Sequence, residues 1–336
     1  IVLASNFILD SSAVTISVTV ISGSSPDDPD RASVVTISGS GSSGTMLTGF
    51  TLTGGFGTFL GDRYAGGGVF VTDCPDASIT FNLVTGNSAT YGGGVAAYGS
   101  SPKFERNIIA YNFSTYGGGI DLNDSPAQVS RNMVAENDAS ITGGAVSISN
   151  SQGAELKDNI FYQNSAVTGG GIASEFSDAV ISHNDFWGNT NGDFSGCDPA
   201  LGDTACCQNY NGVPCDEFSN IFRNPVIVHF EDGVIVVECN SDIIDAGSEQ
   251  NPDCPIGGTR IDIGPYEFDY IVGDADFDGE VDISDVVYLI YYVFDYGLSP
   301  CPLWAGDFNS DRQVNAFDVQ KLLFYIFRDG HGQVCE

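Results

Sequence analysis

The chain has 336 residues, enough for a large core or for two domains. Asp and Glu number 44 against 11 Lys and Arg, which gives a formal net charge of −33. Such a surface repels nucleic acid and anionic membranes, and it disfavours a polyanionic substrate. No apolar stretch reaches the ~20 residues that a transmembrane helix needs. The composition therefore excludes nucleic-acid binding and membrane insertion.

A repeat of 25 or 26 residues runs through the first half of the chain. Runs of Gly begin at Gly66, Gly92, Gly117, Gly143 and Gly169. Pairs of Asn that lie five residues apart follow the same period: Asn82 and Asn87, Asn107 and Asn112, Asn132 and Asn137, Asn159 and Asn164, Asn184 and Asn189. A fixed period in this range is typical of a solenoid.

Each repeat predicts short strands and no helix. Val95 and Ala97 alternate with Ala96 and Tyr98, which is the period of a strand, and Ser100–Pro102 is a turn signal. Gly allows sharp turns and close approach of neighbouring coils, and stacked Asn amides can hydrogen-bond from coil to coil. Parallel pairing of such coils gives a mainly β fold, a right-handed parallel β-helix, in which right-handed crossovers are the rule.

The Gly and Asn pattern resembles the β-helix repeats of the pectin-lyase-like superfamily, in the Gly-Gly-Gly type of secreted bacterial proteins. The resemblance covers residues 1–195, and it implies a fold rather than a function. The alternation of Val14, Ile16, Val18 and Val20 predicts that residues 1–22 already form a strand without a preceding cap. No signal peptide is expected, so a secreted protein would be present here in its mature form.

Residues 196–268 lose the repeat and are expected to form a Cys-rich loop, the last coils and a C-terminal cap. The motifs Asp245-Ala-Gly247 and Asp262-Ile-Gly-Pro-Tyr-Glu267 resemble the ending common to such β-helices, with Pro265 where Ala is usual. The predicted domains are thus 1–195, 196–268 and a third domain over 273–336.

The third domain contains two acidic loops, each followed by an apolar helix expected at 286–294 and 319–327. Oxygen-bearing residues occupy the spacing of an EF-hand loop, with Gly279 at the sharp turn of the first copy and Arg312 in its place in the second. The sequence predicts two Ca²⁺ ions. The predicted ligands are Asp274, Asp276, Asp278, Glu280, Asp282 and Asp285 in the first loop and Asp307, Asn309, Asp311, Gln313, Asn315 and Asp318 in the second.

The paired loops resemble a type I dockerin, a small α-helical EF-hand-like domain of extracellular assemblies. The resemblance covers 273–335 and implies partner contacts at four positions: Ile283, Ser284, Ala316 and Phe317. These residues are more apolar than the Ser-Thr pair common in dockerins, so either a cohesin-like protein or a second copy of this chain could be the partner. A domain of about 60 residues cannot bury all the apolar side chains of the first helix.

Eight of the nine Cys lie after residue 196, without a CxxC pair or a nearby His, which favours disulfides and an extracellular or cell-surface location of a secreted bacterial or archaeal protein. Nearness in sequence suggests Cys239–Cys254 and Cys301–Cys335. Cys197, Cys206, Cys207 and Cys215 would form two further bridges in one of three possible pairings, which leaves Cys74 over. Asn112 and Asn123 begin glycosylation sequons.

No catalytic group is predicted with any specificity. On the outward face after each Gly run, only Asp121 and Glu175 are acidic, about two coils or roughly 10 Å apart, and no His or Lys joins them. If the protein is an enzyme, these two are its candidate catalytic residues.

The leading hypothesis is a secreted, non-catalytic structural or assembly protein that associates head to tail with itself, as a filament or at the cell surface. One alternative is a polysaccharide lyase or glycoside hydrolase tethered by a dockerin. Another is a carbohydrate-binding adhesin.

Overall fold

The computed structural model describes residues 1–39, 44–230, 233–250 and 260–329. The chain divides into two compact units. The first comprises Ile1–Asn224, His229–Val236 and Ile263–Tyr266, and the second comprises Pro225–Val228, Val237–Asp262 and Glu267–Glu336. No helix among the described residues is long and apolar enough to cross a bilayer.

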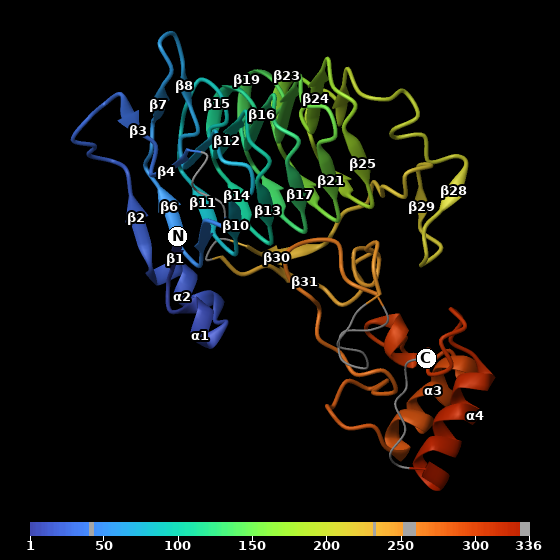
Figure 1. The fold of residues 1–336 in the computed structure, drawn as a ribbon. Helices are drawn as coiled ribbons and strands as arrows, with labels where there is room; N and C mark the ends of the chain where they lie inside the picture. The colour runs from blue at the N-terminus through green and yellow to red at the C-terminus, as the bar shows by residue number, and fades with distance from the viewer. Residues whose placement is uncertain (40–43, 231–232, 251–259, 330–336) are drawn as a thin grey trace. The chain divides into compact units, whose positions relative to one another are not determined.

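The first unit is a parallel β-helix, and its three main sheets run side by side along the stack of coils (Figure 1). Sheet 1 contains β1 (Val2–Ala4), β5 (Met46–Thr48), β10 (Ser78–Thr80), β13 (Lys103–Glu105), β17 (Gln128–Ser130), β21 (Glu155–Lys157) and β25 (Val180–Ser182). Sheet 2 contains β2 (Val20–Ser22), β6 (Thr51–Thr53), β11 (Leu83–Thr85), β14 (Ile108–Ala110), β18 (Met133–Ala135), β22 (Ile160–Tyr162) and β26 (Asp185–Trp187). Sheet 3 contains β4 (Val35–Ser38), β9 (Val69–Thr72), β12 (Val95–Tyr98), β16 (Ile120–Asn123), β20 (Val146–Ser149), β24 (Ile172–Glu175) and β27 (Phe194–Ser195). The predicted β-helix is confirmed.

The remaining strands form smaller elements. A three-stranded parallel sheet, here sheet 4, consists of β15 (Phe113–Tyr116), β19 (Asp138–Thr142) and β23 (Ser165–Thr168). The insertion after the second coil forms β7 (Gly57–Phe59) and β8 (Tyr64–Ala65) and pairs with β3 (Arg31–Ala32). The Cys-rich segment contains β28 (Cys207–Gln208) and β29 (Pro214–Cys215), and β30 (Ile227–His229) and β31 (Val236–Val237) follow it.

The repeated Asn residues form ladders inside the coils. Asn132 illustrates them: its Nδ2 donates to Phe104 O at 2.8 Å and to Asn159 Oδ1 at 3.0 Å, and its Oδ1 accepts from both Asn107 N and Asn107 Nδ2. Each amide thus satisfies backbone groups that the corner leaves unpaired. The predicted structural role of the Asn pairs is confirmed.

The Gly runs allow the coils to approach each other closely. A Cβ on Gly118 would lie 2.5 Å from Gly144 O, and one on Gly93 would lie 2.5 Å from Phe113 O. Backbone atoms occupy this space, so a side chain here would push two coils apart. The residues after each run, Val95, Ile120 and Ile172 among them, are buried in the core as predicted.

The strand predicted over residues 1–22 is only partly correct. β1 and β2 are three residues each, and α1 (Phe7–Asp10) and α2 (Ala13–Val18) lie between them. The helical turns bury Phe7 and Ile16 and leave Leu9, Val14 and Val18 exposed. The alternation of apolar residues was misleading because a short helix can bury one side chain of such a stretch and expose the others.

The second unit contains α3 (Ile283–Asp295), the 3₁₀ helix η1 (Leu303–Gly306), α4 (Ala316–Phe324) and the π-helix η2 (Tyr325–Asp329). Its core joins α3 and α4 through Val286, Leu289 and Leu322, together with Tyr270 and Phe308. Asp245 accepts from the Tyr270 hydroxyl in the same unit.

The disulfide of this unit joins Cys239 to Cys301, 62 residues apart, which corrects the two pairings suggested by nearness in sequence. The core brings η1 and residues around Ile244 together, so spatial nearness follows the fold rather than the spacing. The suggested partners Cys254 and Cys335 lie outside the described residues.

The central four residues of the Asp-Ile-Gly-Pro-Tyr-Glu motif, Ile263–Tyr266, belong to the first unit and lie against the β-helix. Gly264 N donates to Asp158 O at 2.9 Å, and Arg106 Nη1 donates to Pro265 O at 3.5 Å. Gly264 has a φ of +117°, a backbone conformation that residues with a side chain rarely adopt, so this position favours Gly.

Candidate functional site

A covered groove lies on the outward face of sheet 3. Phe70, Ala96 and Asp121 occupy equivalent positions on successive strands of sheet 3, and we call this series the outward column. These residues are buried, although they point away from the core of the coils. Ala65, Tyr91 and Tyr98 pack against it. The cover comes from the insertion at β7–β8 and from the residues before each Gly run.

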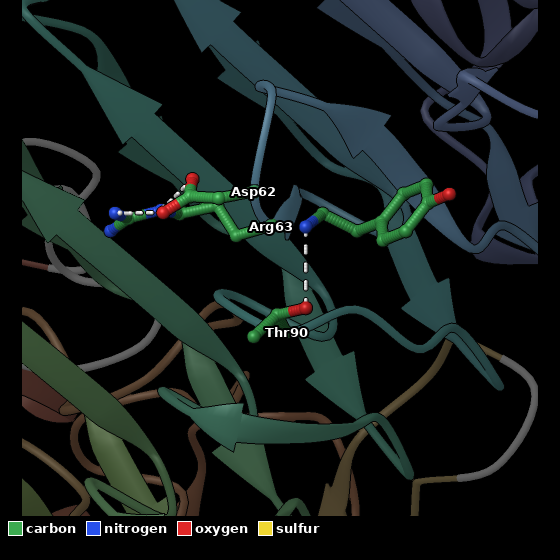
Figure 2. A network of polar contacts seen from close by, with 4 residues as sticks. Asp62, Arg63 and Thr90 are labelled. Carbon is green, nitrogen blue, oxygen red and sulfur yellow. Dashed lines mark hydrogen bonds and ion pairs between the residues drawn. The ribbon is translucent and has the colours of Figure 1, made fainter.

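Arg63, directly before β8, forms the edge of this cover. Its Nε and Nη2 donate to the two carboxylate oxygens of Asp62 at 2.8 and 2.9 Å, and the N–H of the next residue, Tyr64, donates to Thr90 Oγ1 at 3.2 Å (Figure 2). The guanidinium lies 5.1 Å from the centre of the Tyr91 ring. The ion pair fixes a cation over an aromatic face, a favourable arrangement.

Two tyrosines continue this row along the β-helix. The rings of Tyr91 and Tyr116 are stacked, with centroids 4.8 Å apart and planes inclined by 13°. The separation equals the spacing of paired strands, because the two residues occupy equivalent positions on successive coils. The row of Arg63, Tyr91 and Tyr116 forms one wall of the groove.

Asp121 is the buried acid of the groove. It is 1% exposed, and burial raises its pKa to about 7, although the neighbouring Ser147 and Tyr98 hydroxyls partly offset the shift. Its Oδ2 accepts no hydrogen bond of regular geometry from the described residues. A buried carboxylate is costly, and the Ser147 and Tyr98 hydroxyls beside it reduce this cost.

The groove widens into a cavity of about 560 Å³. The residues that line it are Arg63, Tyr91, Tyr116, Asp121, Asn123, Thr142, Ser147, Ile148, Ser149, Asn150, Ala173, Ser174, Glu175 and Ser195. Most of them carry hydroxyl, amide or carboxyl groups. Such a lining suits a polar, hydroxyl-bearing ligand more than an apolar one.

The structure places both candidate catalytic residues, Asp121 and Glu175, on this lining. They lie on β16 and β24, which are separated by β20, a spacing of two strand steps or roughly 10 Å. No His or Lys lies on the lining within the described ranges. Sequence analysis missed Arg63, Tyr91 and Tyr116. Arg63 lies in an insertion that breaks the repeat, whereas Tyr91 and Tyr116 directly precede the Gly runs at Gly92 and Gly117, a recurrence that could have indicated a row of rings.

The acidic loops of the second unit bring only some of the predicted ligands together. Close groups of carboxylates form from Asp274, Asp276 and Asp278, and from Asp307, Asp311 and Asp318. The carboxylates of Glu280, Asp282 and Asp285 lie outside these groups, and the other predicted ligands, Asn309, Gln313 and Asn315, carry amides rather than carboxylates.

Several of these side chains satisfy the backbone of their own loop. Asp274 accepts from Asp278 N and Gly279 N, and Asp285 accepts from Ala275 N, Asp276 N and Asp282 N. Asp282 is the N-cap of α3 and forms a capping box with Asp285, and Asn315 is the N-cap of α4 and forms one with Asp318. Loop closure and helix capping thus account for the pattern of acidic residues.

The predicted partner residues lie at the starts of the two helices. Ile283 and Phe317 are exposed, and Ser284 N and Phe317 N donate to the capping side chains. Further along α3, exposed apolar side chains recur at helical spacing: Val287, Ile290, Tyr291 and Phe294. On α4 and η2 the exposed apolar residues are Phe317, Leu323, Phe324 and Phe327. We call these two sets together the apolar face of the second unit.

The remaining candidates fall into two groups. The Sγ atoms of Cys206 and Cys207 lie 2.8 Å apart, and Cys207 pairs with Cys215 across the β28–β29 ladder. Cys197 follows β27 and Cys74 follows β9. Asn112 is 1% exposed inside the ladder, so the folded chain does not offer its amide for glycosylation. Asn123 Nδ2 donates to Ser149 Oγ at 2.9 Å on the cavity lining.

Fold and groove together define a parallel β-helix protein with a polar groove on one sheet. A family model described as periplasmic copper-binding protein (NosD) matches residues 11–195. The match spans more than half of the chain, and the chain belongs to this family. No curated protein and no solved structure is significantly similar to it. The description of the family as periplasmic agrees with the expected location outside the cytoplasm.

The prediction of two calcium ions is wrong. The family to which the chain belongs is described as binding copper, not calcium. The physical reason for the error is that loop closure and helix capping require the same spacing of acidic residues as an EF-hand loop. The spacing alone therefore did not identify a metal.

Proposed function

We propose that this NosD-family chain is a non-catalytic assembly protein outside the cytoplasm, whose second unit docks onto a second copy of the chain. The observation that carries the proposal is the apolar face. Tyr291 is 56% and Phe294 64% exposed, although both are large apolar side chains on a helix that begins with a full capping box. Exposed apolar patches of this kind mark interaction sites.

The second copy is the proposed occupant because the same chain carries a complementary apolar surface. In the first unit, β1, β2 and the two short helices expose further apolar side chains: Val2, Leu3, Ile8, Leu9, Val14, Val18 and Val20. β1 and β2 are also edge strands of sheets 1 and 2 among the described strands. A contact between two different surfaces of one chain is heterologous, and repetition of it builds open chains of molecules.

The resemblance of 273–335 to a dockerin supports a docking role for this unit. The charge of the chain also has a consequence for assembly. With a net charge of −33, two copies repel each other, so association should strengthen when added salt screens the repulsion.

Copper, which the family description names, finds no matching group of side chains among the described residues. Among the described residues, every close group of three or more His, Cys, Asp or Glu side chains consists of Asp alone. Copper favours imidazole, thiolate and thioether ligands. Met133 is buried in the core and His229 is exposed, so neither adds a ligand to these groups.

Sedimentation velocity across a range of concentrations tests the proposal. We expect the sedimentation coefficient of the whole chain to rise with concentration and with added NaCl. The double substitution Val287→Glu and Phe294→Glu should leave a monomer, whereas Val167→Glu, at an exposed apolar residue of the β-helix, should associate normally. A whole chain that stays monomeric at every concentration and salt level contradicts the proposal.

A further inference from the structure

The row of rings along the groove ends abruptly at Tyr116. The guanidinium of Arg63 covers Tyr91, and Tyr91 covers one face of Tyr116. On the next coil, the partner of Tyr116 is Thr142, and after it comes Thr168. The row therefore changes from rings to short hydroxyl side chains within one coil, and the cavity lies at this step.

The floor of the groove changes in the same direction. The outward column of sheet 3 runs Phe70, Ala96 and Asp121 on the covered side, and then Ser147 and Ala173. The first three are buried, whereas Ser147 and Ala173 are partly exposed and line the cavity. Small side chains on both wall and floor leave the space open. The volume of about 560 Å³ lies within the ~300–1,000 Å³ range of small-molecule sites.

Hydrogen-bonding groups surround this space at the coil of Thr142, where the row has no aromatic ring. Asp121 contributes an almost fully buried carboxyl group to the lining, and Asn123 and Ser149 are hydrogen-bonded neighbours on it. Glu175 adds an exposed carboxylate at the far end. The site thus offers acceptors for hydroxyl donors, beside an aromatic face.

We propose that the cavity binds a neutral saccharide, with one sugar ring stacked on Tyr116 above Thr142 and its hydroxyls hydrogen-bonded to Asn123, Ser149 and Glu175 of the lining. A pyranose ring has an apolar face of C–H groups that packs on an aromatic ring, and its equatorial edge carries hydroxyls. The sugar ring would occupy the next stacking position after Arg63, Tyr91 and Tyr116. This site is independent of the apolar face of the second unit.

The charges of the cavity favour a neutral sugar over an anionic one. Glu175, an exposed carboxylate on the lining, would repel a carboxylate or sulfate. Arg63 is the only basic residue on the described lining, and its guanidinium is engaged by both oxygens of Asp62. An anionic sugar would have to displace this ion pair.

Isothermal titration calorimetry with cellotetraose, xylotetraose, maltotetraose and mannotetraose tests the proposal, with tetragalacturonate as the anionic arm. We expect at least one neutral tetrasaccharide to bind. Tyr116→Ala should weaken it about tenfold, the equivalent of ~1.4 kcal/mol. The matched control is Phe113→Ala, an exposed aromatic residue on the same strand outside the lining, which should bind as the unaltered chain does.

A second variant keeps the test decisive if Tyr116→Ala does not fold. Thr142→Tyr extends the row of rings into the cavity, so it should abolish binding while the thermal unfolding midpoint remains close to that of the unaltered chain. Unchanged binding in a folded Thr142→Tyr would overturn the proposal. Binding of tetragalacturonate alone, or of none of the five sugars, would also overturn it.

Discussion

Asn107 donates twice to the side-chain oxygen of Asn132, once from its backbone N at 2.9 Å and once from its Nδ2 at 3.0 Å. The same pair of bonds recurs from coil to coil, for example between Asn132 and Asn159. Each ladder Asn therefore serves two coils at once, and its removal leaves buried donors and acceptors on both.

Asn132→Ala should destabilise the β-helix by roughly 2–4 kcal/mol, because several buried polar groups lose their partners together. Urea unfolding followed by far-ultraviolet circular dichroism measures the effect. Gln128→Ala, at an exposed residue of the same coil, is the matched control and should change stability little. Equal effects of the two substitutions would show that the ladder contributes nothing special.

Gly118→Ala should destabilise the chain by about 1–3 kcal/mol or prevent folding, because the new Cβ meets backbone atoms of the next coil that cannot rotate away. Gly61→Ala is the informative comparison. Its φ is +93° but nothing lies within 4 Å of the new Cβ, so it measures the conformational cost without a clash. The steric account requires Gly118→Ala to be the more harmful of the two.

The buried carboxyl of Asp121 makes stability depend on pH. Its pKa is about 7 in the folded chain and 3.8 in its ordinary state, so between these values the folded state holds the proton more tightly. This group therefore lowers stability as pH rises from about 4 to 7, by an order-of-magnitude ~2–4 kcal/mol in total, with no further loss above that range.

Asp121→Asn should remove this slope, so the variant should gain stability relative to the unaltered chain as pH rises from 4 to 7. Thermal unfolding at intervals of half a pH unit measures the difference. The control Asp124→Asn removes an exposed carboxyl from the same coil and should keep the slope. A stability difference between Asp121→Asn and the unaltered chain that is constant with pH would refute the assignment.

Reduction of the Cys239–Cys301 bond should loosen the second unit and not the β-helix. Loss of a disulfide typically costs ~2–4 kcal/mol. Hydrogen exchange with mass spectrometry should therefore show faster exchange in α3 and α4 of Cys301→Ser, with the ladders of sheets 1 and 2 unchanged. This expectation rests on the pairing of Cys239 with Cys301. If peptide mapping of the oxidised chain finds Cys239 linked to a different cysteine, the pairing is contradicted.

The repeat made the β-helix predictable, because its Gly and Asn residues each have one physical role that recurs at a fixed spacing. The short elements of residues 1–22 were mispredicted because local alternation does not distinguish a strand from a single helical turn that buries Ile16. The groove was only half predictable. The positions of Asp121 and Glu175 on the outward face could be predicted from strand register. Arg63 lies in an insertion, and no local sequence pattern predicts the path of that insertion. The acidic loops misled because capping and metal binding use the same residues.

The central claim is that the apolar face of the second unit binds another copy of the chain. The most direct test replaces Tyr291 with p-benzoylphenylalanine and irradiates a mixture of ¹⁵N-labelled and unlabelled chains. We expect mixed-isotope cross-links from position 291 to peptides within residues 1–22. Cross-links found only within single chains, or none at all, would contradict the account.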